Sequence, residues 1–263
     1  KNIYIVPPYQ KLKSYNKKLK EIFINNKYDI VHSHINTLSI FPLRIAKKCG
    51  VKIRISHSHS SLGKGEFKRN VLKRILRIFS KKYATHYFAC SASTGIFQFG
   101  KKVFDKGLIN IIPNSIDTSK FIYNENFKND YNNGELKNKF VIGHVGRFET
   151  VKNHKFLLQI LAKLVKKDAK YHLFLVGDGK LFEETKAYAN DLNISKHVTF
   201  LGSVFNPEIY YSLFDLFVLP SLYEGFPVTA IEAQTNGLKC LYSSRIHKEI
   251  DILISTTVIE VGV

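Results

Sequence analysis

The sequence predicts an α/β protein made of two Rossmann-like halves, each a parallel β-sheet covered by helices. Three observations predict this class. Short apolar runs rich in β-branched residues alternate with helical patterns along the chain, the runs are apolar on both faces, and one polar segment interrupts the alternation. Strands that are apolar on both faces lie in parallel sheets that helices cover on both sides.

The predicted elements follow one another in this alternating order. In the first half, strands are predicted at 2–6, 29–33, 51–56, 86–91 and 109–113. Helix-like stretches lie between them, at 11–26, 37–49, 66–82 and 92–101. In the second half, strands are predicted at 139–145, 171–177, 197–202, 216–220, 238–243 and 257–262. The helices expected there are 153–167, 180–192, 207–213, 228–236 and 246–252.

The segment "YNENFKNDYNNGELKN" (123–138) is rich in Asn, Asp and Gly, which indicates a linker or a long crossing loop. We therefore expect a first domain over 1–120, a linker over 121–138 and a second domain over 139–263. A ligand cleft is expected between the carboxyl ends of the two sheets. Because the chain begins with Lys1 and contains no methionine, we expect a fragment or a processed chain, with both domains incomplete at the outer ends.

Composition narrows the class of protein. No apolar run of 18 residues occurs, so no membrane-spanning helix is expected. The three cysteines, Cys49, Cys90 and Cys240, lack the spacing of a metal or redox motif, which fits a reducing compartment. The net charge of +19 lies wholly in residues 1–120, which hold 24 Lys and Arg against 5 Asp and Glu. This asymmetry indicates an anionic partner, and a compositional bias toward lysine is the alternative.

A turn with two cations follows the first strand of the second half. The run "FVIGHV" predicts a strand, "HKFLLQILAKLV" predicts a helix, and "GRFETVKNH" (146–154) joins them. One interpretation is a solvated loop in a lysine-rich chain. The other is that Arg147 and Lys152 hold a diphosphate.

A second turn, in "LPSLYEGFPVTAIEAQTNG" (219–237), carries two carboxylates between a strand and a helix. Backbone N–H groups near Gly225 and Phe226 would point outward at the helix N-terminus, which suits a hydroxyl-rich or anionic ligand. A carboxylate accepts two hydroxyl hydrogen bonds at once, so Glu224 and Glu232 suit a sugar. Taken alone, Glu232 would be interpreted as an ordinary surface charge.

Three motifs in order resemble one enzyme family. Glu224 and Glu232 form an E-x(7)-E arrangement, "GRFETVKN" matches G-R-x-x-x-x-K-N, and "IPNSID" (112–117) precedes both. Together they resemble the retaining nucleotide-sugar glycosyltransferases of family four (group 1), especially the bacterial capsule and exopolysaccharide enzymes. Ser115 departs from the glycine common in that family. The resemblance implies the GT-B architecture, in which two Rossmann-like domains face each other across a cleft.

The resemblance also implies residue roles. Arg147 and Lys152 would neutralise the leaving diphosphate, Glu232 would hold the ribose hydroxyls, and Glu224 would contact the donor sugar. The segments "VGDG" and "FLGSV" would seat the nucleobase. The expected donor-binding residues are Gly146, Arg147, Lys152, Gly177, Gly179, Val204, Glu224, Gly225, Phe226, Pro227 and Glu232.

Histidines at the ends of two predicted strands are expected on the acceptor side. In the enzymes that the chain resembles, a histidine seven residues after the preceding glycine contacts the donor sugar. The resemblance therefore implies His57, counted from Gly50, as a catalytic residue beside Arg147, Lys152 and Glu224, with His59 as the reserve. The expected acceptor-side residues are His32, His34 and His59. A metal site of four histidines is the alternative. The sequence disfavours it, because the two His-Ser-His runs lie on separate strands without a carboxylate partner.

The motifs predict chemistry without a metal or another cofactor. The chain has no Asp-x-Asp segment, so Arg147 and Lys152 would replace Mg²⁺ as the groups that stabilise developing charge. No carboxylate is clearly placed as a nucleophile. As in the family, front-face, ion-pair-like substitution is therefore favoured over a glycosyl-enzyme.

The basic stretch 66–82 places an apolar stripe and seven cations on a predicted helix. Such a helix either packs its apolar stripe on the sheet or docks on an anionic membrane. Both can hold at once, with the stripe facing the sheet and the cations facing the lipid phosphates. The chain carries no recognisable nucleic-acid module, so nucleic acid is not an expected partner. The stripe is expected to contain Phe67, Val71, Leu72, Ile75, Leu76 and Phe79.

Together these observations predict a cytoplasmic hexosyltransferase, peripheral on the inner face of the cell membrane. It would move a sugar from a nucleotide sugar, with UDP the expected nucleotide, onto a lipid-linked or saccharide acceptor in surface polysaccharide biosynthesis. The alternatives are transfer to a soluble sugar-phosphate-like acceptor, and a non-catalytic module that binds nucleotide sugars.

Overall fold

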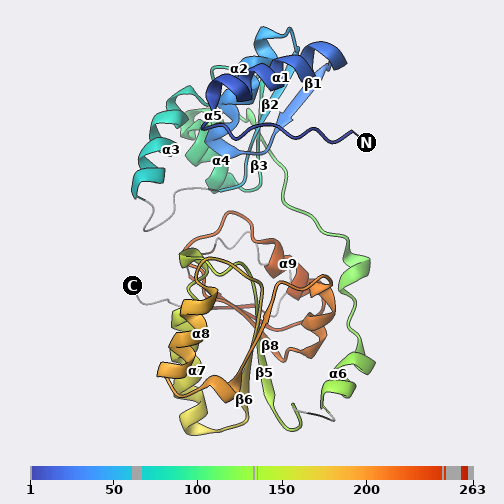
Figure 1. Cartoon of the computed structure of the whole chain (residues 1–263), viewed down its shortest axis with the longest axis vertical. Coiled ribbons are helices and arrows are strands. Elements are labelled where there is room, and N and C mark those ends of the chain that lie inside the picture. The colour runs from blue at the N-terminus through green and yellow to red at the C-terminus, as the bar shows by residue number, and fades with distance from the viewer. Residues whose placement is uncertain are drawn as a thin grey trace. The chain divides into compact units, whose positions relative to one another are not determined.

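The computed structural model of the chain describes residues 2–60, 67–132, 134, 136–244, 246 and 256–259. The chain divides into two compact units, Lys1–Pro113 and Asn114–Val263, each built on one parallel sheet (Figure 1). The prediction of two Rossmann-like α/β domains is therefore confirmed. The boundary lies in the "IPNSID" segment, a few residues before the expected one.

The sheet of the first unit has the strand order β1-β2-β3-β4, and its neighbouring strands are all parallel. These strands are β1 (Ile30–Ser33), β2 (Ile53–Ser58), β3 (His86–Ala89) and β4 (Ile109–Ile111). The helices are α1 (Leu12–Asn26), α2 (Ile40–Lys48), α3 (Phe67–Phe79), α4 (Ala92–Phe99) and α5 (Lys101–Asp105), with a 3₁₀ turn, η1, at Asn36–Ser39. Apolar residues of α1 and α2 form one buried cluster, which includes Leu19, Phe23 and Ile45.

The strand predicted at 2–6 is absent from the described structure. Residues 2–6 have no regular structure, and Ile3 and Ile5 are 91% and 89% exposed. The apolar run is right for a strand, but the described sheet consists of β1-β2-β3-β4, and none of these strands pairs with this segment. A strand without a partner does not gain the ladder of hydrogen bonds that would stabilise it.

The second unit has the strand order β10-β9-β8-β5-β6-β7, also parallel. The strands are β5 (Phe140–Val145), β6 (Tyr171–Val176), β7 (Val198–Gly202), β8 (Leu216–Leu219), β9 (Cys240–Ser243) and β10 (Thr256–Ile259). The α-helices are α6 (Glu125–Asn132), α7 (His154–Lys167), α8 (Phe182–Asp191) and α9 (Val228–Thr235). The 3₁₀ turns are η2 (Thr118–Phe121), η3 (Thr150–Lys152), η4 (Ser195–His197) and η5 (Pro207–Leu213).

Two predictions about this unit were wrong in detail. The segment 121–138, expected as a linker, contains the end of η2 and the helix α6. Phe121 and Leu136 are buried, and Phe127 and Tyr131 pack against the core, so the segment is part of the second unit. The α-helix expected at 207–213 is the 3₁₀ turn η5. The helix expected at 246–252 lies almost wholly outside the described residues.

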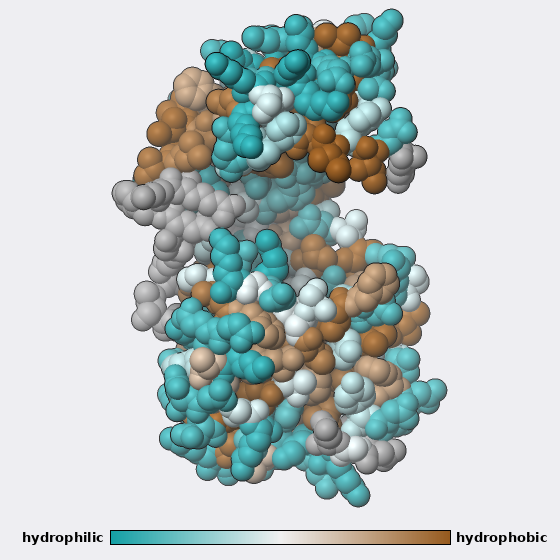
Figure 2. Space-filling view, in the orientation of Figure 1, coloured by the Kyte–Doolittle hydropathy of each residue, from teal (hydrophilic) through white to brown (hydrophobic). Residues whose placement is uncertain are grey.

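Helix α3 presents apolar side chains to the surface. Of the stripe residues whose side chains are described, only Leu76 is buried, whereas Val71, Leu72, Ile75 and Phe79 are 40–51% exposed. Ile78 is 73% exposed. Figure 2 shows hydrophobic residues gathered over this helix. The interpretation that α3 packs its whole stripe on the sheet was therefore wrong.

Candidate functional site

The loops that carry the predicted donor residues follow neighbouring strands. Strand β5 pairs with β6 on one side and with β8 on the other, so the chain order reverses at β5. In open α/β sheets, ligands bind outside the carboxyl ends of the strands at such a switch point. The turn with Arg147 and Lys152 follows β5, and the turn with Glu224 follows β8. The fold thus brings both predicted turns to one place.

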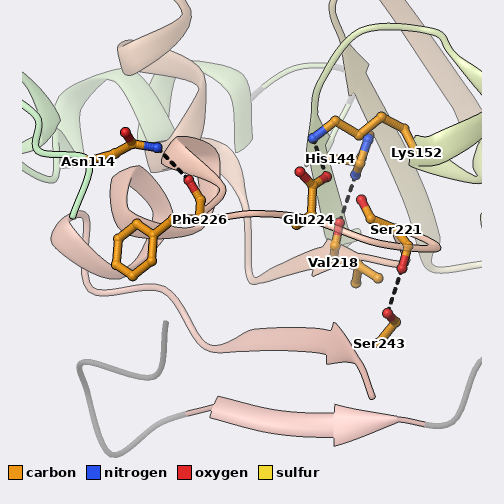
Figure 3. Close-up of polar contacts among 8 residues, drawn as sticks. All are labelled: Asn114, His144, Lys152, Val218, Ser221, Glu224, Phe226 and Ser243. Carbon is orange, nitrogen blue, oxygen red and sulfur yellow. Dashed lines mark hydrogen bonds and ion pairs between the residues drawn. The ribbon is translucent and has the colours of Figure 1, made fainter. Parts of the chain in front are cut away.

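Lys152 and Glu224 form an ion pair between these two turns. The ammonium Nζ donates to Glu224 Oε1 over 2.7 Å, and the two side chains are only 15% and 16% exposed (Figure 3). Lys152 ends η3, and Asn153 then adopts the left-handed conformation at φ 57° before α7 begins. An asparagine tolerates this conformation better than most residues. The lysine is thereby held in place rather than free in solvent.

Arg147 has a different environment. Its side chain is 80% exposed, and its only ion pair in the described structure is a 3.4 Å contact to Glu149. The two predicted phosphate-binding cations therefore lie in the same turn, but only Lys152 is fixed by the fold. An exposed guanidinium can reorient toward an incoming anion at little cost in side-chain packing.

The turn after β8 is fixed at several points. The N–H of Leu222 donates to Val151 O over 2.8 Å, which joins this turn to the Lys152 turn. Ser243 Oγ donates to Ser221 O over 2.6 Å, and Asn114 Nδ2 donates to Phe226 O over 2.7 Å (Figure 3). Asn114 lies within the "IPNSID" motif, but it was not among the predicted site residues. No sequence signal indicated Ser243.

A buried histidine, His144, lies beneath the Lys152 turn and was also missed. Its Nδ1 is 2.8 Å from Val218 O, and its Nε2 has no partner in the described structure. A carbonyl only accepts, so Nδ1 carries the proton. Complete burial lowers the pKa of His144 to about 4. A Cβ on Gly146 would lie 3.1 Å from His144 Nε2 and 3.2 Å from Lys152 Cε, so the glycine leaves room for both side chains.

Glu232 projects from α9 and is held by a tyrosine. The Tyr211 hydroxyl donates to Glu232 Oε2 over 2.5 Å, and Tyr211 is fully buried. Burial raises the pKa of Glu232, and it also raises that of Tyr211, so the hydroxyl keeps its proton. This bond fixes the carboxyl group and uses one of its two oxygens. Tyr211 was not among the predicted residues.

The glycines of the "VGDG" turn pack against the chain itself. A Cβ on Gly177 would lie 2.2 Å from Gly146 O, and one on Gly179 would lie 2.6 Å from Phe148 O. Close approach of the β5 and β6 turns therefore explains both glycines without a ligand. Val204 is partly buried against the core. The nucleobase contacts of these residues stay predictions.

In the first unit, all four predicted histidines lie together at the ends of β1 and β2. His32 Nε2 is 3.1 Å from His57 Nδ1, and His34 Nδ1 is 2.9 Å from His59 Nε2. Burial and the neighbouring histidines lower the pKa of His57 to about 4, and they also lower the pKa of His32. Within the described residues, His32, His34 and His57 form the one group of three or more side chains that could hold a metal ion.

The described helices include none that is both long and apolar enough to cross a membrane.

The carboxyl end of the second sheet combines a fixed lysine, an exposed arginine and two oriented carboxylates. Such an arrangement can bind a ligand that carries both an anionic group and hydroxyl groups.

Comparison with known proteins matches both halves of the chain. The family model described as Glycosyltransferase Family 4 matches residues 2–120, and the model of Glycosyl transferases group 1 matches residues 126–255. The protein EpsF of Bacillus subtilis is 35% identical over 231 residues, which cover 86% of this chain and 60% of EpsF. A UDP-Gal:alpha-D-GlcNAc-diphosphoundecaprenol alpha-1,3-galactosyltransferase of Escherichia coli is 30% identical over 253 residues, or 93% of this chain and 64% of that enzyme.

Solved structures share the fold. HepE of Anabaena in complex with UDP-glucose has a TM-score of 0.84 at 18% identity, covering 99% of this chain and 72% of that one. WaaG, a glycosyltransferase involved in lipopolysaccharide biosynthesis, has a TM-score of 0.72 at 16% identity, covering 98% of this chain and 72% of WaaG. The chain thus spans about three fifths of the curated relatives described above. It belongs to the GT-B glycosyltransferases of family four, group 1.

Proposed function

We propose that the chain belongs to a retaining transferase that moves a hexose from a UDP-sugar to a lipid-linked or saccharide acceptor in surface polysaccharide biosynthesis. The observation that carries this proposal is the Lys152–Glu224 pair at the switch point of the second sheet. The pair holds a cation for the donor diphosphate and a carboxylate for the donor sugar on touching loops. Arg147 supplies a second, movable cation.

The proposed chemistry needs no metal at the diphosphate. As the bond between sugar and phosphate breaks, negative charge grows on the leaving diphosphate, and fixed cations lower the energy of that state. Lys152 would then divide its hydrogen bonds between the phosphate and Glu224. An ammonium group has three protons to donate, so both contacts can coexist. Because Glu224 is already engaged by Lys152, we favour front-face substitution over attack by this carboxylate.

The nucleotide would bind through Glu232. Tyr211 orients one carboxyl oxygen, which leaves the other to accept hydrogen bonds from the ribose hydroxyls. HepE binds UDP-glucose, and the name of the Escherichia coli relative specifies UDP-Gal, which supports UDP as the nucleotide. His57 is proposed to contact the donor sugar, and His32, His34 and His59 are proposed for the acceptor side.

A screen of nucleotide sugars by thermal shift tests the donor, and transfer to a polyprenyl-diphosphate-linked sugar tests the reaction. We expect stabilisation by UDP and by one UDP-sugar, together with a glycosylated lipid product whose anomeric configuration equals that of the donor. An inverted product would refute the retaining mechanism. Binding without any transfer would favour the non-catalytic module, and transfer only to a sugar phosphate would favour a soluble acceptor.

The acceptor proposal includes a membrane surface. The Escherichia coli relative and a Campylobacter jejuni relative both act, by name, on sugars linked to diphospho-undecaprenol. Helix α3 supports docking at such a surface, because it exposes Val71, Leu72, Ile75 and Ile78 beside cations. Apolar side chains would enter the headgroup region, and each nearby Lys or Arg contributes about 1 kcal/mol at an anionic leaflet. We propose that the enzyme works on the cytoplasmic face.

Vesicle flotation separates the two contributions of α3. We expect binding to vesicles that contain anionic lipid and weaker binding as salt rises, because the screening length falls to about 8 Å at physiological ionic strength. Replacing Lys73, Arg74, Arg77 and Lys81 with glutamine should abolish the preference for anionic lipid. The variant Ile75→Ser/Ile78→Ser should weaken binding at every composition. Equal binding of the wild-type chain to neutral and anionic vesicles, or none at low salt, would refute this role.

A further inference from the structure

The proposed reaction gives the four histidines contacts with substrates, but it does not account for their contacts with one another. Four imidazole rings gather at the carboxyl ends of β1 and β2, with centroid separations of 4.0–5.2 Å between neighbouring rings. Alternate residues of a strand point to the same face, so His32 lies with His34 and His57 lies with His59. The parallel pairing of Ser33 with Ser56 then places the two pairs side by side.

We propose that His32, His34 and His57 bind one divalent transition-metal ion, with zinc the first choice, and that His59 positions His34. The two histidine pairs lie on separate strands of the sequence, but those strands are hydrogen-bonded neighbours, so their separation along the chain does not disfavour a shared ion. Imidazole nitrogen suits zinc, copper and nickel, whereas Mg²⁺ prefers oxygen. The site is therefore distinct in chemistry from a magnesium clamp on a diphosphate.

The distances fit a tetrahedral ion. One ligand nitrogen from each of the three histidines lies within 4.8 Å of the others. Zinc–nitrogen bonds of about 2.0–2.1 Å place two nitrogens of a tetrahedral site about 3.3–3.4 Å apart. His32 Nε2 and His57 Nδ1 are already 3.1 Å apart, so a slight opening of this pair admits an ion. Three histidines leave the fourth position to water or to a substrate oxygen.

His59 and Asn36 provide the support that such a site requires. His59 Nε2 lies 2.9 Å from His34 Nδ1, so His34 can donate its Nδ1 proton and use Nε2 for the ion. The His59 backbone N–H donates to Asn36 Oδ1 over 2.6 Å, which ties the end of β2 to the chain after β1. His57 is 4% exposed, and the edge of Phe88 lies against the rings of His32 and His57. The ligands are therefore held close together before any ion binds.

Metal binding by the purified chain tests the proposal independently of transfer. The protein, without a histidine tag, is stripped with a chelator, desalted, and titrated with Zn²⁺ by calorimetry and with Co²⁺ by visible absorption. We expect one ion per chain and the intense visible bands of tetrahedral Co²⁺. His34→Ala, an exposed position, and His57→Ala should each weaken binding by more than about 100-fold, and His59→Ala by about 10–100-fold.

His86→Ala serves as the matched control, because His86 is an exposed histidine at the start of β3, outside the cluster. It should bind the metal as the wild-type chain does, and circular dichroism of each variant checks that it is folded. The proposal would be overturned by the lack of a stoichiometric ion, or by equal binding in folded His34→Ala. The cluster would then be two hydrogen-bonded pairs of neutral imidazoles. Because the readout is bound metal, failure of the proposed transfer reaction would leave this result unaffected.

Discussion

Replacing Lys152 with alanine should lower both the stability and the turnover of the enzyme, by separable amounts. Removing this ammonium leaves Glu224 as an unpaired carboxylate that is only 16% exposed. At 2.7 Å and an effective dielectric constant of about 20, the lost attraction is about 6 kcal/mol, most of which desolvation offsets. Breaking a buried pair costs about 3–5 kcal/mol and an exposed pair about 0–1 kcal/mol. For this half-buried pair we expect a loss of about 2–3 kcal/mol in the free energy of unfolding.

The double variant Lys152→Ala/Glu224→Gln separates the two effects. A neutral amide tolerates burial better than an unpaired carboxylate, so more than half of the lost stability should return. Turnover should stay about 10²–10³-fold below wild type in both variants, because the donor to the leaving diphosphate is still missing.

The assays are urea unfolding followed by circular dichroism, since the chain has no tryptophan, and transfer to the lipid-linked acceptor. Lys170→Ala is the matched control, because its pair with Asp168 is 49% and 45% exposed. It should cost less than about 1 kcal/mol and leave transfer unchanged. Near-wild-type transfer by Lys152→Ala would refute the diphosphate role. A double variant no more stable than Lys152→Ala would refute the ion-pair argument.

The other predictions concern metal, the donor sugar and pH. Transfer should survive EDTA. Loss of activity that Mg²⁺ or Mn²⁺ restores would refute the metal-free diphosphate site. Loss of activity that only Zn²⁺ restores would instead indicate a role for the histidine cluster. His57→Ala should abolish transfer and leave the affinity for UDP, measured by calorimetry, nearly intact. If His59→Ala is inactive and His57→Ala is active, the donor-sugar contact belongs to His59 instead. The free energy of unfolding should fall as the pH decreases from about 6.5 toward 4, because the pKa of His144 is about 4 in the folded chain and about 6.5 in an unfolded one. His144→Gln should reduce that slope in urea titrations by up to about 1.4 kcal/mol per pH unit, and an unchanged slope would contradict the assignment.

Local patterns predicted most of the elements because each depends on neighbouring residues. The apolar runs at 139–145 and 171–177 became β5 and β6, since burial on both faces of a parallel strand leaves a continuous apolar signature. The run at 2–6 has the same signature and is not a strand. Whether a run finds a partner strand depends on the sheet order, which is a property of the whole unit.

The same distinction holds for the candidate site. The sequence by itself determined the residue types: Arg147 and Lys152 in one turn, Glu224 and Glu232 around another, and histidines at two strand ends. Only the tertiary structure decided that Lys152 meets Glu224, because β5 and β8 are neighbours although the two residues are 72 positions apart in the sequence. It also decided that the four histidines form one cluster. Periodicity specifies the face a side chain occupies, whereas pairing between strands specifies what that face meets.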